Sequence, residues 1–82
     1  MKITVSKDAV KALGRMPTNV AARIRAKIRQ YADDPASLAN NVAKLQGRDG
    51  YRLRVGDCRV IFAIADDTMQ VLDIGPRGGI YD

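Results

Sequence analysis

The sequence predicts a single α+β domain in which a helical hairpin packs on one face of a mainly antiparallel sheet, in the order β-α-α-β-β-β. A short strand-like segment, residues 2–5, precedes two segments between residues 6 and 32 whose apolar residues recur with helical spacing. Three strand-like segments joined by tight turns then follow between residues 51 and 74. Because 82 residues can bury one core, we expect one domain spanning residues 1–82.

The first helix is expected to be short. Ser6 is a typical N-cap residue, since its hydroxyl can accept a hydrogen bond from a backbone N–H of the first turn. Helical spacing directs Val10 and Leu13 toward the core, and Gly14 is expected to end the helix.

The second helix is predicted from Pro17 to about Ala32. Proline is tolerated in a first helical turn, and the segment 33–35, Asp-Asp-Pro, ends the helix because the residue before proline avoids helical backbone angles. The inward-facing residues recur at helical spacing: Val20, Ile24, Ile28 and Tyr31.

The stretch 36–50 is less regular. Leu38, Val42 and Leu45 fit either another helical turn or a packed loop. The glycine-containing segment 46–50 indicates a turn before the sheet.

A β-hairpin is predicted around the two-residue loop 56–57, Gly-Asp, with glycine at a position that requires positive φ. This loop places Val55 opposite Cys58 and Arg54 opposite Arg59. Alternation then gives the hairpin one apolar face that joins the core: Tyr51, Leu53, Val55, Cys58, Val60 and Phe62.

The other face of the hairpin carries Arg52, Arg54 and Arg59. Like charges directly opposite each other across a strand pair are destabilising. A solvated outer face is the simpler interpretation, but the cost of this opposition favours an anion site, for which phosphate is the obvious ligand.

The strand 59–65 has apolar residues on both faces, which indicates a central position in the sheet. We expect a three-residue loop, 66–68, because it places Leu72 and Ile74 on the core face. Asp73 then lies near the arginine face, whereas a two-residue loop would direct Asp73 into the core.

The C-terminal tail is expected to return to this arginine face. The last strand runs antiparallel to its neighbour, so its end lies beside Arg59 and the turn 56–57. Arg77 and Tyr81 would then reach the edge of the patch, with Gly78-Gly79 as a flexible break between them.

Composition narrows the function classes. Fourteen Lys and Arg residues against nine acidic ones give a formal net charge of +5, which suggests a nucleic acid or an acidic protein as partner. With no histidine and one cysteine, neither a zinc-binding pattern nor a Cys/His dyad exists, and Asp66-Asp67 is interpreted as a turn. We expect no metal or other cofactor. The lack of a signal-peptide core or a membrane-length apolar run leads us to expect a cytoplasmic protein.

Three segments resemble the RelE/ParE superfamily of toxins from toxin–antitoxin pairs, and the resemblance covers essentially the whole chain. They are Leu45-Gln46-Gly47, Tyr51-Arg52-Leu53-Arg54-Val55-Gly56-Asp57-Cys58-Arg59-Val60-Ile61-Phe62, and Asp73-Ile74-Gly75-Pro76-Arg77-Gly78-Gly79-Ile80-Tyr81. The resemblance implies a small toxin that is neutralised by a cognate antitoxin in a hetero-oligomer.

The RelE branch of this superfamily implies an mRNA interferase, which is a metal-independent endoribonuclease that inhibits translation by cleaving mRNA in the ribosomal A site. Its partners would be mRNA and ribosomal RNA, besides the antitoxin. The resemblance implies that Arg52 and Arg54 hold the phosphate and help proton transfer. It further implies that Arg59 and Arg77 stabilise the transition state and that Tyr81 stacks on the substrate base.

Two other functions remain open. A non-catalytic toxin of the ParE branch would inhibit DNA gyrase, and a degenerate toxin would only bind its antitoxin. We favour the endoribonuclease, because arginines with a tyrosine form a phosphodiester site that a purely protein-binding toxin does not need. The basic residues of the second helix allow two interpretations, a solvated surface or a face that docks RNA or antitoxin: Arg23, Arg25, Lys27 and Arg29.

Overall fold

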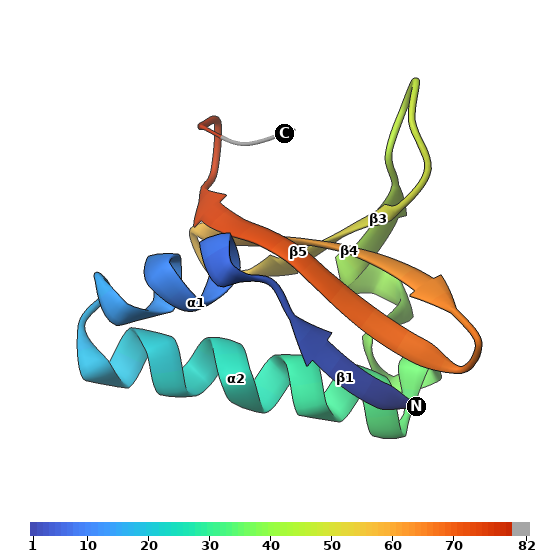
Figure 1. Ribbon diagram of the computed structural model, residues 1–82, viewed down its shortest axis with the longest axis horizontal. Coiled ribbons are helices and arrows are strands. Elements are labelled where there is room, and N and C mark those ends of the chain that lie inside the picture. Colours follow the sequence, from blue (N-terminus) through green and yellow to red (C-terminus); the bar gives the residue numbers. More distant parts are fainter. Residues whose placement is uncertain (80–82) are drawn as a thin grey trace.

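The computed structural model describes residues 1–79, which form a five-stranded sheet with helices packed against one face (Figure 1). The elements are β1 (Lys2–Val5), α1 (Lys7–Gly14), α2 (Thr18–Asp33), the 3₁₀ helix η1 (Pro35–Asn41), β2 (Val42–Lys44), β3 (Tyr51–Val55), β4 (Cys58–Ala65) and β5 (Thr68–Pro76). The predicted fold class is confirmed. None of the helices in the described part is long and apolar enough to cross a membrane.

The strands lie in the order β1-β5-β4-β3-β2, and only the β1–β5 pair is parallel. β4 is the middle strand, as predicted from its apolar residues on both faces. The stretch 36–50 contains η1 and then β2, an edge strand that pairs with β3 through Val42 opposite Leu53. The sequence does not reveal β2, since three residues are too few to show alternation.

The predicted N-cap of α1 is confirmed, and Ser6 also ties the helix to the sheet. Its Oγ accepts a hydrogen bond from the backbone N–H of Ala9 at 3.1 Å and donates one to the carbonyl of Leu72 at 2.6 Å. The helix ends at Gly14, as expected.

The inward position predicted for Val10 is wrong, because this side chain is 56% exposed. The buried positions of α1 are Ala9 and Leu13, which are one helical turn apart. Val10 follows Ala9 by one residue, and so it points about 100° around the helix, away from this buried row.

α2 has the predicted limits to within one residue at each end, and Ile24, Ile28 and Tyr31 are buried as expected. The Tyr31 ring lies 5.0 Å from the Phe62 ring, which in turn stacks on Tyr51 at 5.4 Å between centroids. These three rings connect α2 to β4 and β3. Burial raises the pKa of the Tyr31 hydroxyl, and the nearby Tyr51 acts in the same direction.

The register of the β3–β4 hairpin is confirmed, with Val55 opposite Cys58 and Arg54 opposite Arg59. The three-residue loop predicted before the last strand is wrong. Ala65 pairs with Thr68, which leaves a two-residue loop, Asp66-Asp67. Both aspartates have positive φ, 51° and 57°, as the tight turns that suit hairpins require.

A β-bulge reconciles this short loop with a buried Ile74. Phe62 pairs with Val71 but Ile61 pairs with Asp73, so Leu72 is the extra residue in β5. Ile74 therefore faces the core opposite Val60, as predicted, and Asp73 lies on the side of the arginines. The core position predicted for Leu72 is wrong, because its side chain is 36% exposed.

Ser6→Ala should lower the free energy of unfolding by about 1–2 kcal/mol, since it removes an N-cap and a hydrogen bond to the sheet. Urea denaturation measures this change. Ser6→Thr keeps the hydroxyl and is the matched control, which should retain most of the stability. An alanine variant as stable as the threonine variant would contradict the assignment.

Candidate functional site

Arg52, Arg54 and Arg59 come together on the sheet face opposite the helices, as the sequence predicts. Arg54 and Arg59 are direct partners across the β3–β4 ladder. The three side chains line a hollow of about 130 Å³, which we call the arginine hollow. Four residues of the preceding segment complete its lining: Asn40, Asn41, Val42 and Ala43.

The three arginines differ in how firmly they are held. Arg59 is only 7% exposed, and its Nη1 donates hydrogen bonds to the carbonyls of Gly56 at 3.1 Å and Cys58 at 3.0 Å. Arg52 is half-buried. Arg54 is exposed and makes no hydrogen bond or ion pair to another residue in the described range 1–79. The hollow thus combines a fixed guanidinium with an available one.

The tail returns to the hairpin turn, as predicted. Pro76 pairs with Cys58, and the backbone N–H of Arg77 donates to the carbonyl of Asp57 at 2.7 Å. The backbone of Arg77 is therefore held at the hairpin turn. Its exposed side chain is not among those that line the arginine hollow. Tyr81 lies outside the described residues.

Sequence reasoning missed the amide wall of the hollow, formed by Asn40 and Asn41. These residues end η1 and precede β2, whose pairing with β3 brings them to the arginines. No periodic signal marks them, since the segment between Pro35 and Lys44 contains one kinked 3₁₀ helix and one very short strand.

The size and chemistry of the arginine hollow define what it can bind. Pockets for whole small molecules measure about 300–1,000 Å³, so a hollow of about 130 Å³ fits one group of a longer ligand. Arginine binds phosphate through a planar fork of donors and stays charged. Within the described residues, no group of three or more Cys, Asp or Glu side chains could hold a metal ion. The site is suited to binding a phosphodiester and stabilising negative charge on it.

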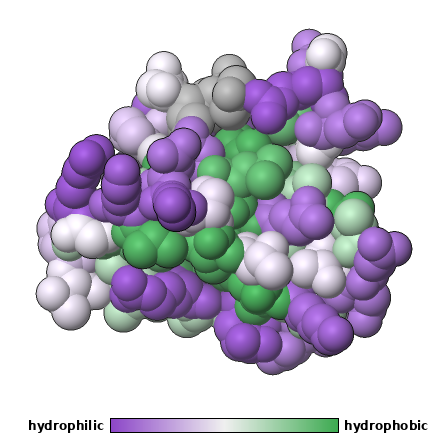
Figure 2. All heavy atoms as spheres, in the orientation of Figure 1, coloured by the Kyte–Doolittle hydropathy of each residue, from purple (hydrophilic) through white to green (hydrophobic). Residues whose placement is uncertain are grey.

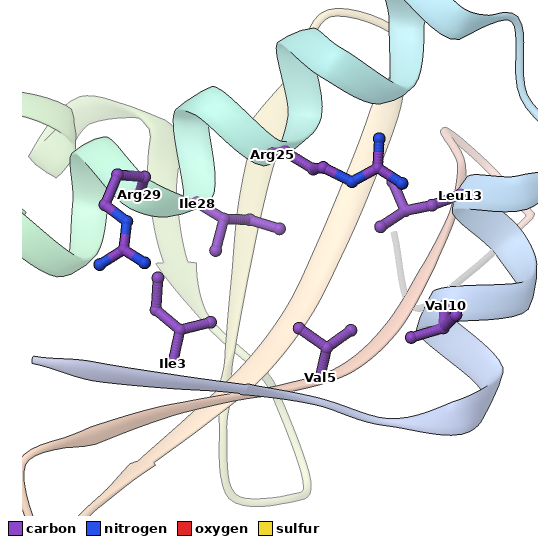
Figure 3. Close-up of a pocket in the computed structure, with 7 residues that line it drawn as sticks. All are labelled: Ile3, Val5, Val10, Leu13, Arg25, Ile28 and Arg29. Atoms are coloured by element: carbon purple, nitrogen blue, oxygen red, sulfur yellow. The ribbon is translucent and has the colours of Figure 1, made fainter.

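A second hollow, of about 340 Å³, lies between β1, α1 and α2 (Figure 3). Its lining is mainly apolar, with two arginines of α2 at the side: Ile3, Val5, Val10, Leu13, Ile28, Arg25 and Arg29. Figure 2 shows apolar side chains gathered on this face of the molecule among hydrophilic ones. We call this hollow the apolar groove. It contains no nucleophile or general base, so it is suited to docking and not to catalysis.

The fold and the arginine hollow together define a small basic α+β domain with a hollow suited to binding an anionic group. A family model described as "ParE toxin of type II toxin-antitoxin system, parDE" matches residues 3–81. The chain therefore belongs to this family of toxins, within the RelE/ParE superfamily that its motifs resemble.

Individual relatives agree with this assignment. The chain is 31% identical to Toxin RelE3 of Methanocaldococcus jannaschii, over all of this chain and 97% of that protein. It superimposes on the archaeal RelE–RelB complex from Pyrococcus horikoshii with a TM-score of 0.80 and 31% identity, covering 95% of this chain and 96% of that one. The RelB–RelE complex from Methanococcus jannaschii gives a TM-score of 0.74 at 26% identity, covering 95% and 94%.

Arg59→Ala should lower the free energy of unfolding by about 1–3 kcal/mol. A hydrogen bond from a charged donor contributes about 1.5–3 kcal/mol, whereas the relieved cross-strand repulsion is of the order of 0.2–1 kcal/mol. Arg54→Ala removes the same repulsion without losing a bond to a described residue, so it should be neutral or slightly stabilising. Urea denaturation of both variants compares the contribution of the Arg59 hydrogen bonds with that of the Arg54–Arg59 repulsion. Equal stability of the two variants would show that the hydrogen bonds of Arg59 do not stabilise the fold.

Proposed function

We propose that this chain is the toxin of a toxin–antitoxin pair and a metal-independent endoribonuclease that cleaves mRNA on the ribosome. The observation that carries the proposal is the convergence of Arg52, Arg54 and Arg59 on one hollow. A toxin that acts only by binding another protein has no need to hold like charges together against their repulsion.

RNA supplies its own nucleophile for this reaction. The 2′-hydroxyl gives its proton to a water molecule and attacks the adjacent phosphorus, and the bond from phosphorus to the 5′-oxygen of the next nucleotide breaks. That oxygen takes up a proton as it leaves. The protein aligns the phosphate and stabilises the negative charge that develops on its oxygens.

The arrangement of the arginines suggests how they divide this work. The exposed Arg54 and the half-buried Arg52 would grip the phosphate and assist proton transfer. Arg59 is already oriented by the hairpin carbonyls, so it would stabilise the transition state with little reorganisation. Arg77 would approach from the hairpin turn, and Tyr81 would stack on the substrate base.

Two observations support the ribosome as the place of cleavage. The relatives that cover the chain at 31% identity carry RelE names. The net charge of +5 also favours association with ribosomal RNA through its phosphates. We therefore propose that the substrate is mRNA in the ribosomal A site and that the protein is cytoplasmic.

The experiment that tests this function is induction of the chain without its partner, followed by mapping of mRNA 5′ ends. Cuts within translated codons are expected. Arg54→Ala and Arg77→Ala should each reduce cleavage by about 10²–10³-fold, the usual effect of losing one electrostatic stabiliser. Arg15→Ala changes an exposed arginine outside the hollow and is the matched control.

Other outcomes select the alternatives. Intact mRNA with a DNA-damage response would indicate a gyrase inhibitor, the function suggested by the ParE name of the matching family. Intact mRNA with normal growth would indicate a degenerate toxin that only binds its antitoxin. Unchanged cutting by both arginine variants would move the active centre elsewhere.

The antitoxin would dock in the apolar groove. The structural relatives from Pyrococcus horikoshii and Methanococcus jannaschii are complexes of RelE with RelB, which supports an antitoxin partner here. Val5 and Val10 expose apolar surface in this groove, and Arg25 and Arg29 stand beside it. An amphipathic segment with acidic residues along one side would match both features.

Val10→Asp should weaken binding to the cognate antitoxin by about tenfold or more, because it would bury a charge in an apolar interface and repel the acidic residues expected of the partner. Val10 is exposed in the free chain, so the variant should fold normally. Ile64→Asp is the matched control, because Ile64 is an exposed apolar residue outside the groove. Titration of each variant with the antitoxin measures the change, and equal losses in the two variants would count against the groove.

A further inference from the structure

The arginine hollow has a wall that offers hydrogen-bond acceptors as well as donors. Arginine side chains donate hydrogen bonds and accept none, which suits phosphate oxygens that only accept. The Asn40 and Asn41 side chains of the amide wall each offer an accepting oxygen as well as a donating NH₂ group. The NH₂ groups can also donate to phosphate oxygens. The accepting oxygens are used only by a ligand group that donates, and the edge of a base offers both donors and acceptors.

The two amides are not used to hold the fold together. Neither side chain makes a hydrogen bond to another residue in the described range, and Asn40 is exposed while Asn41 is half-buried. The first half of η1 differs, because Ser37 donates to the carbonyl of Asp34 at 2.7 Å and accepts from Gln30 at 3.1 Å. Polar side chains of this segment are therefore structural at its start and available at its end.

The backbone around the amides is nevertheless well positioned. Leu38 is buried and anchors the middle of η1 in the core. β2 begins immediately after Asn41, and Val42 pairs with Leu53 in β3. The amides are thus placed between an anchored side chain and a paired strand, a few residues from Arg52 and Arg54 along the neighbouring strand. Such a framework can present side chains in a constant orientation.

We infer that Asn40 and Asn41 form a base-reading subsite, which contacts the donor–acceptor edge of the nucleotide whose phosphate lies on the arginines. Single-stranded RNA is recognised through such edges when its bases are unstacked, and asparagine pairs well with mixed donor–acceptor groups. The inference rests on the proposed function and deepens it, since it assigns base preference to residues outside the arginine set. Val42 and Ala43 provide a small apolar surface beside the amides.

The first test measures binding to short single-stranded RNAs that differ in one base, by fluorescence anisotropy at fixed salt. The parent protein should prefer one base by about tenfold, within the range for a side chain that reads a base edge. The double variant Asn40→Ala/Asn41→Ala should bind all the RNAs with similar affinity. Arg54→Ala should instead weaken binding to every RNA to the same extent.

Asn19→Ala is the matched control, because Asn19 is an exposed asparagine in the first turn of α2, away from the hollow. It should keep the parent's base preference. Thermal unfolding verifies that the double variant is folded. A parent that binds all the RNAs equally, or a double variant that keeps the parent's preference, would overturn the subsite.

The second test separates this inference from the proposed reaction by mapping mRNA 5′ ends for the parent and the double variant. Cleavage that continues with a broader sequence distribution supports the subsite, whereas an unchanged distribution overturns it and leaves the nuclease intact. If the parent cleaves no RNA but discriminates bases through the amides in the binding assay, the proposed reaction fails and the subsite stands.

Discussion

The two-residue turn between β3 and β4 is the constraint on which the site depends. Gly56 adopts a φ of 56°, and this conformation lets the strands pair with Arg54 opposite Arg59. The carbonyl of Gly56 in the same turn accepts a hydrogen bond that orients the Arg59 guanidinium, and the carbonyl of Asp57 accepts one from the backbone N–H of Arg77. A shift of β4 by one residue against β3 would turn Arg59 toward the core and Val60 away from it. The arginine face, the fixed guanidinium and the return of Arg77 to the turn therefore share one origin.

The turn also reduces the destabilisation that is expected from the Arg54–Arg59 pair. Cross-strand repulsion suggests a site that is held together at the expense of stability. The structure shows Arg59 buried and bonded to backbone carbonyls, so part of the positive charge is balanced by oriented dipoles close to it. Arg54 keeps its charge exposed. An anionic ligand would thus meet one donor already in position and another that can adjust.

The sequence predicted the parts of the fold in which a regular pattern runs over several residues. The alternation in β3 and β4 and the helical spacing in α2 identified the faces that join the core. The predictions from sequence were wrong where a single residue interrupts the regular pattern or where the element is short. The bulge at Leu72 reverses the alternation within β5, and its effect depends on pairing with β4, which the local sequence does not encode. Val10 was misplaced because α1 has only eight residues, so its buried side depends on the neighbouring strand.

The candidate site divides in the same way. Its arginines on β3 and β4 were predictable, because one hairpin determines their arrangement. Asn40 and Asn41 were not, because they reach the hollow through the tertiary pairing of β2 with β3. Segments that are irregular in sequence can thus complete a site whose charged residues are visible from periodicity alone. Polar residues in such segments are best judged by whether the fold uses their hydrogen bonds.

The two hollows lie on different sides of the sheet, and this separation constrains how a partner could act. The apolar groove lies on the helix side at the β1 edge, whereas the arginine hollow lies on the opposite face over β3 and β4. β5 separates β1 from β4 in the sheet order, so one compact segment cannot fill both hollows. An antitoxin held in the groove would need a second segment that passes around the sheet to cover the arginines. Affinity would then come from the segment in the groove, and neutralisation from the segment over the arginines. Because the two segments are linked, binding of the first would hold the second near its site at a high effective concentration.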